Sequence, residues 1–197
     1  MNAMRHFTKL AVLAALSVAA ASCGDVATAG RAPVYLVIDR LEGGTDTLST
    51  VVLSDVMTNG SITNDPGVVT FSLAQKDVVQ ANTVGPSTNN QVTVNRYHVA
   101  YKRADGRNIE GVDVPYAFDG AATATVGLVG ETKISFELVR HVAKMESPLV
   151  QLANPSVGTT VITTLAYVTF YGNDVVGNAI QATGTIQVDF GNFADAK

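Results

Sequence analysis

The chain has 197 residues and a formal net charge of −4 at pH 7, and 47% of its residues are hydrophobic. This acidic balance argues against nucleic acid as a partner, because nucleic-acid recognition starts from a basic patch or stripe. The single cysteine excludes an intramolecular disulfide, an iron–sulfur cluster and a zinc site with several thiolate ligands. The fold therefore has to be stabilised by its apolar core.

The first 23 residues have the three parts of a secretory signal. Residues 1–9 carry Arg5 and Lys9 but no acid, residues 10–21 are almost wholly apolar, and small residues precede Cys23. The apolar run is about half as long as the roughly 20 residues that a transmembrane helix needs. The pattern therefore favours export over a spanning helix. An ordinary signal that is cleaved before a structural cysteine stays open as an alternative.

The end of this signal resembles the lipobox of bacterial lipoproteins, because small residues lead directly into Cys23. The resemblance implies that Cys23 becomes the first mature residue and carries a lipid that anchors the protein to a membrane. Lipoproteins usually have Leu three residues before the cysteine, where Ala20 stands here. Gly24, and not Asp, follows the cysteine, which in the family favours the outer membrane over the inner one. The implied location is the bacterial cell envelope, facing the periplasm or the surface.

Three segments are expected: a lipoprotein signal peptide (1–22), a flexible tether (23–32) and one β-sandwich domain (33–197). Removal of the signal leaves 175 residues, which suits one domain, with a net charge of −6 by formal count. The tether is small and polar, and a fully extended chain gains at most about 3.5 Å per residue, so the domain stays within about 30 Å of the membrane.

The mature sequence is rich in Val and Thr, has Gly and Pro at short intervals, and has no convincing amphipathic helix. Only 141–153 could form a helical turn, which Pro148 limits. The expected fold is all-β: an antiparallel, immunoglobulin-like Greek-key β-sandwich of about eight or nine strands, with a closed barrel as the alternative. The expected strands lie within residues 34–38, 50–56, 68–76, 92–103, 111–118, 122–129, 131–140, 161–171 and 180–190.

Periodicity adds detail to several of these strands. The runs 34–38 and 161–171 are apolar or Thr nearly throughout, which predicts burial on both faces, whereas 180–190 alternates and predicts one buried face. In 92–103 the apolar side chains first occupy even positions, Val92 and Val94, and then odd positions from Tyr97 onward. This change of alternation predicts a β-bulge at Asn95–Arg96. Pro115 limits 111–118 to an edge strand or an extended loop.

The segments 171–178 (YGNDVVGN) and 182–184 (ATG) look like the last hairpin of bacterial immunoglobulin-like and fibronectin-type-III-like extracellular modules. The resemblance covers about 30 residues. It implies a sandwich and carries no catalytic residue over. The whole chain resembles uncharacterised lipoproteins of Gram-negative bacteria that are built on one such domain.

The sequence shows no catalytic motif. G-x-S-x-G, Walker, G-x-G-x-x-G and H-E-x-x-H patterns are all missing. After the signal only His98 and His141 remain, and a catalytic or metal-binding role needs a third partner. The favoured interpretation is therefore not an enzyme, and a hydrolase with a carboxylate pair ranks third.

Two candidate sites fall in the turn-rich segment 105–120. Its oxygen-rich side chains make Asp113 and Asp119 the best candidate ligands for calcium, the only cofactor the sequence suggests. Asp105, Tyr116 and Phe118 are the candidate interaction surface.

Tyr97 and Tyr101 share one face of their strand. They are expected to pack in the core with their hydroxyls at the rim, and the alternative is a sugar-binding platform.

Together these patterns favour a non-catalytic, lipid-anchored protein of the cell envelope that acts as a structural or protein-interaction module. The alternative is an extracytoplasmic module that binds carbohydrate or calcium. The expected partners are the membrane, through the lipid on Cys23, and an envelope protein.

Overall fold

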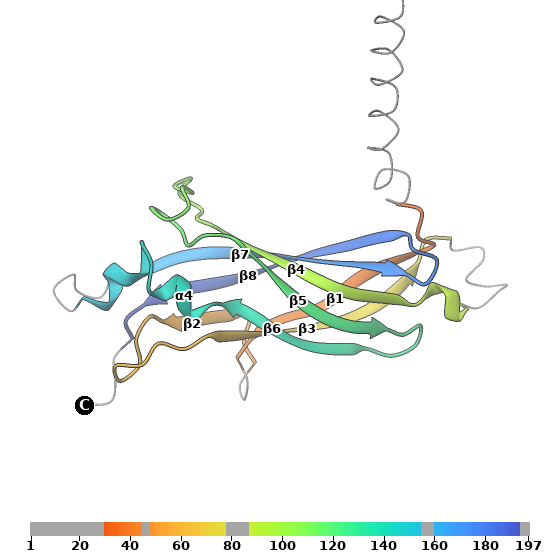
Figure 1. The fold of residues 1–197 in the computed structure, drawn as a ribbon, viewed down its shortest axis with the longest axis horizontal. Helices are drawn as coiled ribbons and strands as arrows, with labels where there is room; N and C mark the ends of the chain where they lie inside the picture. The colour runs from red at the N-terminus through yellow and green to blue at the C-terminus, as the bar shows by residue number, and fades with distance from the viewer. Residues whose placement is uncertain (1–29, 45–47, 78–86, 155–159, 194–197) are drawn as a thin grey trace, which may run out of the picture.

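A computed structural model describes residues 30–44, 48–77, 87–154 and 160–193 (Figure 1). The predicted signal peptide, Cys23 and most of the tether lie outside the described residues. The described part holds two sheets, a three-stranded one in the order β1-β3-β6 and a five-stranded one in the order β2-β8-β7-β4-β5. The strands are β1 (Val34–Gly43), β2 (Val51–Asp55), β3 (Asp65–Gln75), β4 (Val92–Lys102), β5 (Phe118–Val126), β6 (Thr132–Val139), β7 (Ile162–Asp174) and β8 (Ala179–Gly191).

This arrangement confirms the predicted all-β sandwich, with eight strands in the described ranges. The orders β1-β3-β6 and β8-β7-β4 match the strand orders in the two sheets of immunoglobulin-like sandwiches. One pairing differs from the antiparallel expectation. β2 runs parallel to β8, from the pair Val51–Gln187 to the pair Asp55–Gly191, because the chain passes from β1 into the other sheet and does not turn back on itself.

The core lies between the two sheets and is centred on aromatic rings. Phe170 of β7 contacts Phe71 of β3 and Phe136 of β6 edge to face, with ring centroids 5.0 and 5.3 Å apart. These rings come from opposite sheets, so their burial holds the two layers together.

The prediction that two strands are buried on both faces is wrong. In β1 the side chains of Val34 and Leu36 are buried, but Tyr35 between them is 57% exposed. In β7 Leu165 is exposed, although Ala166 next to it is fully buried. Within the described ranges, outward-facing side chains of β1 and β7 are thus exposed. β-Branched and aromatic residues fit an open pleated face as well as a covered one, so composition alone does not distinguish the two cases.

The predicted bulge is confirmed. The registers of β4 with β5 and with β7 both shift between Val94 and Arg96. The extra residue lets Val94 and Tyr97 both face the core although their sequence parity differs. Arg96 consequently points outward and is paired with Tyr171 of β7.

The segment 111–117 forms a loop, and β5 begins only at Phe118, so of the two predicted forms the extended loop is the one observed. Gly111 adopts a positive φ of 75°, a conformation that interrupts a strand.

The segment 141–153 forms a short helix, α4 (His141–Lys144), and a 3₁₀ helix, η2 (Leu149–Ala153). A further 3₁₀ turn, η1, spans Thr88–Asn90. Among the described residues, no helix has the length and apolarity needed to cross a membrane.

Candidate functional site

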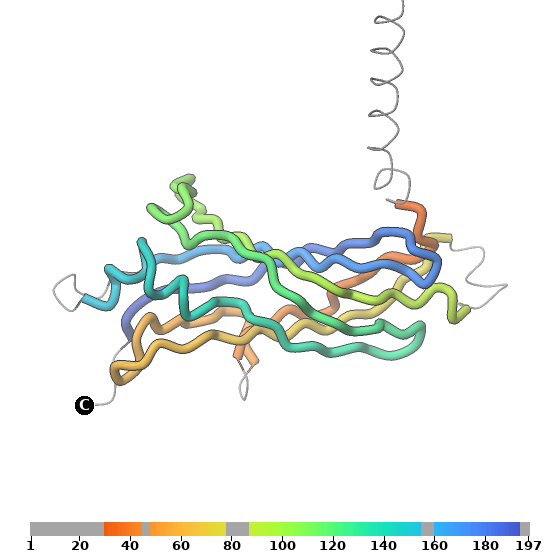
Figure 2. The backbone as a smooth tube through the Cα atoms, viewed as in Figure 1, coloured from red at the N-terminus to blue at the C-terminus, as the bar shows by residue number. Residues whose placement is uncertain are grey.

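The loop between β4 and β5, residues 103–117, is called here the contact loop. It stands away from the sandwich at the end opposite to residue 30 (Figures 1 and 2). Val114 in this loop is fully buried and anchors it to the core. Backbone N–H groups of Gly111 and Asp113 donate to the carbonyls of Val114 and Ile109, each at 2.8 Å. The loop is thus a folded part of the domain with its own hydrogen bonds.

Asp105 closes the base of the contact loop. Its carboxylate accepts hydrogen bonds from the guanidinium groups of Arg103 at 2.7 Å and Arg107 at 2.9 Å, and from the backbone N–H of Arg107. These bonds, first of all the one from Arg103, hold the pKa of Asp105 well below its usual range. The carboxylate is exposed, so we assign it a role in the shape of the loop and not in overall stability.

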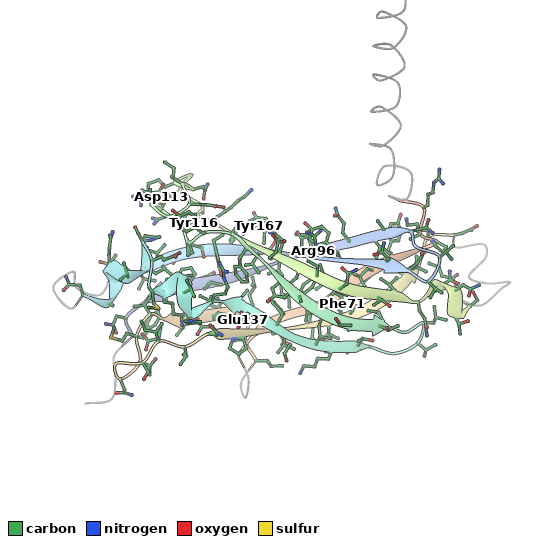
Figure 3. The ribbon with its side chains drawn as sticks, viewed as in Figure 1. Phe71, Arg96, Asp113, Tyr116, Glu137 and Tyr167 are labelled. Carbon is green, nitrogen blue, oxygen red and sulfur yellow. The ribbon has the colours of Figure 1, made fainter. Side chains whose placement is uncertain are left out.

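Three large apolar side chains of the contact loop face solvent. Ile109 is 65% exposed, Val112 is 63% exposed and Tyr116 is 50% exposed. Figure 3 shows Tyr116 and Asp113 at this projecting end. These side chains give the contact loop an apolar surface on a backbone that its own hydrogen bonds hold in place.

Phe118, which the sequence placed on the candidate interaction surface, is only 6% exposed. Its ring lies 6.2 Å from that of Tyr97, and the guanidinium of Arg140 covers it at 4.2 Å. We therefore remove Phe118 from that surface, because as the first residue of β5 it points into the sandwich. Asp105 and Tyr116 remain on it.

The two candidate calcium ligands have other partners. Asp113 accepts a hydrogen bond from the backbone N–H of Ile109 at 3.2 Å. The carboxylate of Asp119 lies 3.3 Å from His98 and 3.6 Å from Arg96. Throughout the described ranges, no three His, Cys, Asp or Glu side chains gather in a way that could hold a metal ion. The geometry thus gives the calcium hypothesis no support.

Tyr97 and Tyr101 lie in the core, as expected, but the Tyr101 hydroxyl is buried and does not reach the rim. The Tyr101 hydroxyl donates to the carbonyl of Leu138 at 2.6 Å, and the Tyr97 hydroxyl accepts from the backbone N–H of Glu137 at 3.2 Å. Burial raises the pKa of both phenols. Neither ring is available as a sugar platform.

The two histidines have separate surroundings. His98 faces Asp119, while Nδ1 of His141 lies 2.8 Å from Oδ1 of Asn64. The two rings thus have different partners and do not belong to one group.

A cleft of about 710 Å³, which the sequence did not predict, lies at the end of the sandwich where residue 30 enters. The side chains that line it come from β1, β3, β4, β7, β8 and their ends, and include Tyr35, Lys76, Asn95, Arg96, Tyr171, Asn173 and Gln181. The bulge at Arg96 was a usable signal, since it predicts an outward arginine. Arg96 lies beside Tyr171, however, only because β4 pairs with β7, and the sequence does not reveal that pairing.

No protein-family model matches the chain, and no curated protein matches it.

Proposed function

We propose that this protein is a non-catalytic, lipid-anchored component of the bacterial cell envelope that binds another envelope protein through its contact loop. The observation that carries the proposal is the exposure of Ile109, Val112 and Tyr116 on a loop whose backbone is fixed. Binding residues are commonly placed on loops that a rigid scaffold positions, and an immunoglobulin-like sandwich is such a scaffold.

The chemistry of the contact loop suits a protein partner. Aromatic and aliphatic side chains form the centre of protein interfaces, and arginine is enriched there as well. Here Tyr116, Ile109 and Val112 supply the apolar centre, and Arg107 lies at the edge, held by Asp105. A loop that is already ordered loses little conformational entropy on binding, which favours affinity.

The membrane part of the proposal rests on the signal and on Cys23. The tether after Cys23 is short, so any partner has to be reached close to the membrane surface. The outer membrane is favoured because Gly24 follows the cysteine.

The contact loop is tested by a triple variant, Ile109→Ser, Val112→Ser and Tyr116→Ser, in the full-length protein. Interface residues of this kind each contribute about 1 to 2 kcal/mol when they are central, so we expect recovery of the cross-linked envelope partner to fall at least about tenfold. The measurement is cross-linking in intact cells, followed by affinity purification and quantitative mass spectrometry.

The matched control changes three exposed valines in other turns, Val129→Ser, Val175→Ser and Val176→Ser. It should leave recovery unchanged. Equal recovery with the contact-loop variant and the wild type, or no partner enriched by the wild type, contradicts the proposal.

Lipidation is tested by mass spectrometry of the mature N-terminal peptide from the membrane fraction. We expect Cys23 at the N-terminus with a diacylglyceryl group on its sulfur, and the protein in the outer-membrane fraction of a density gradient. The Cys23→Ser variant should leave the membrane or keep its signal. A free thiol at Cys23, or an uncleaved signal on the wild-type protein, refutes the anchor.

A further inference from the structure

The cleft at the end near residue 30 has a charge character unlike that of the whole chain. The protein is acidic overall, yet the residues that line the cleft include the cations Arg96 and Lys76 and no aspartate or glutamate. The nearest acid paired with Arg96 is Asp119, at 3.6 Å, and that carboxylate is shared with His98. A local excess of positive charge is therefore left facing the cleft.

Both cations are held in place by aromatic rings. The guanidinium of Arg96 lies 4.2 Å from the ring centroid of Tyr171, and the ammonium of Lys76 lies 4.9 Å from that of Tyr35. Lys76 Nζ also donates to the carbonyl of Gly30 at 3.0 Å. Stacking on a ring fixes a guanidinium while leaving its N–H edge free to bind an anion. Figure 3 shows Arg96 on the outer side of β4.

Carboxamide groups complete the lining. Asn95 and Asn173 lie side by side, with Nδ2 of the first 3.4 Å from Oδ1 of the second, and Gln181 is exposed on the neighbouring strand. Each amide offers both donors and an acceptor, the combination that sugar hydroxyls need. Tyr35 adds an exposed ring, which can pack against the apolar face of a sugar.

We propose that this cleft binds an acidic saccharide, a sugar unit that carries a carboxylate or a phosphate. Arg96 and Lys76 bind the anionic group, and Asn95, Asn173 and Gln181 bind the hydroxyls. A volume of about 710 Å³ falls within the usual range of ligand sites and accommodates a disaccharide. A neutral sugar would not neutralise the positive charge that Arg96 and Lys76 place at the cleft, and a metal ion would find no carboxylate among the lining residues.

The ligand can come from the headgroup of an anionic glycolipid or from a free acidic saccharide. Gly30 lines the cleft and is seven residues from Cys23, so a lipid on Cys23 would keep the cleft within about 25 Å of the membrane. Only this question of source rests on the proposed anchor. The cleft itself is independent of the anchor and of the contact loop.

The test is binding of the purified full-length protein to a panel of acidic glycans and their neutral counterparts, with affinities measured by calorimetry. The pair cellobiouronic acid and cellobiose differs only in the carboxylate, and glucose 6-phosphate supplies a phosphate. Hydrogen bonds to an ionised group are roughly twice as strong as those between neutral groups, so we expect acidic members to bind at least about tenfold more tightly than their neutral counterparts. Arg96→Gln and Lys76→Gln should each remove most of that preference.

Lys102→Gln is the matched control. Lys102 stacks on Tyr167 at 5.2 Å on the same sheet but does not line the cleft, so binding should be unchanged. Vesicles of phosphatidylcholine with and without the phosphorylated glycolipid lipid A distinguish the sources. Retention that needs both lipid A and Arg96 indicates a membrane headgroup, and binding to free glycans alone indicates a soluble ligand. The proposal is overturned if no acidic glycan of the panel binds, if neutral counterparts bind equally, or if Arg96→Gln and Lys76→Gln leave binding unchanged.

Discussion

Replacing Phe170 by alanine should lower the free energy of unfolding by about 4 kcal/mol, since large-to-small changes of buried aromatic residues cost about 3 to 5 kcal/mol. Phe170 is fully buried, and its ring meets those of Phe71, Phe136 and Tyr97 at 5.0, 5.3 and 6.1 Å. The change would open a cavity between the two sheets and remove contacts that join them. Urea unfolding followed by circular dichroism measures the loss.

Two further variants control for this effect. Phe170→Leu keeps most of the volume, so its loss should be clearly smaller than that of Phe170→Ala. Tyr167→Ala removes a ring from the outward side of the same strand, where Tyr167 is only half-buried, and should cost about 1 kcal/mol or less. If Phe170→Ala costs no more than Tyr167→Ala, the aromatic cluster is not the centre of the core.

Replacing Lys144 by methionine should destabilise the protein by about 3 to 5 kcal/mol, the usual cost of removing one partner of a buried ion pair. Lys144 is 1% exposed, and its ammonium donates to the Asp65 carboxylate and to the carbonyl of Asp55, each at 2.8 Å. Oδ2 of Asp65 is buried without a hydrogen-bond partner among the described residues, so methionine at 144 would leave a partly buried carboxylate without its cation. The same urea unfolding measurement applies.

A double variant separates the effect of the broken ion pair on stability from the effect of lost packing. Lys144→Met combined with Asp65→Leu removes both charges, and we expect it to recover most of the lost stability. The control variant Lys133→Met replaces an exposed side chain of β6 and should change stability by about 0.5 kcal/mol or less. A loss below about 1 kcal/mol for Lys144→Met, or no recovery in the double variant, contradicts a structural ion pair.

The parts of the fold that could be predicted from sequence are those that local periodicity determines. The bulge at Arg96 follows from a change of parity within one strand, and the buried side of β8, with Ile186 and Val188, follows from strict alternation. The strand order and the parallel pairing of β2 with β8 could not be predicted in this way. They depend on which sheet the chain enters after each turn, and no residue type specifies that choice.

In the candidate site, too, local sequence features could be predicted and contacts between distant segments could not. The exposed contact loop was predicted from its turn residues and Pro115. Phe118 was misplaced because the first residue of a strand points inward or outward according to register, which the sequence leaves open. Lys144 and Asp65, far apart in the chain, meet only because α4 packs on the sandwich. The cleft likewise needs β1, β3, β4, β7 and β8 in their final positions.

The position of β1 determines how the domain would respond to mechanical load. β1 pairs antiparallel with β3 at nine positions, from Val34–Gln75 to Gly43–Gly67, and both strands run along the length of the sandwich (Figure 2). A lipid on Cys23 would pull at the end where residue 30 enters, while a partner on the contact loop would hold the opposite end. That force acts along the strands, so it shears the whole β1–β3 ladder at once and does not peel its hydrogen bonds one by one. If the domain is held at these two ends, the β1–β3 ladder would resist the force as one unit.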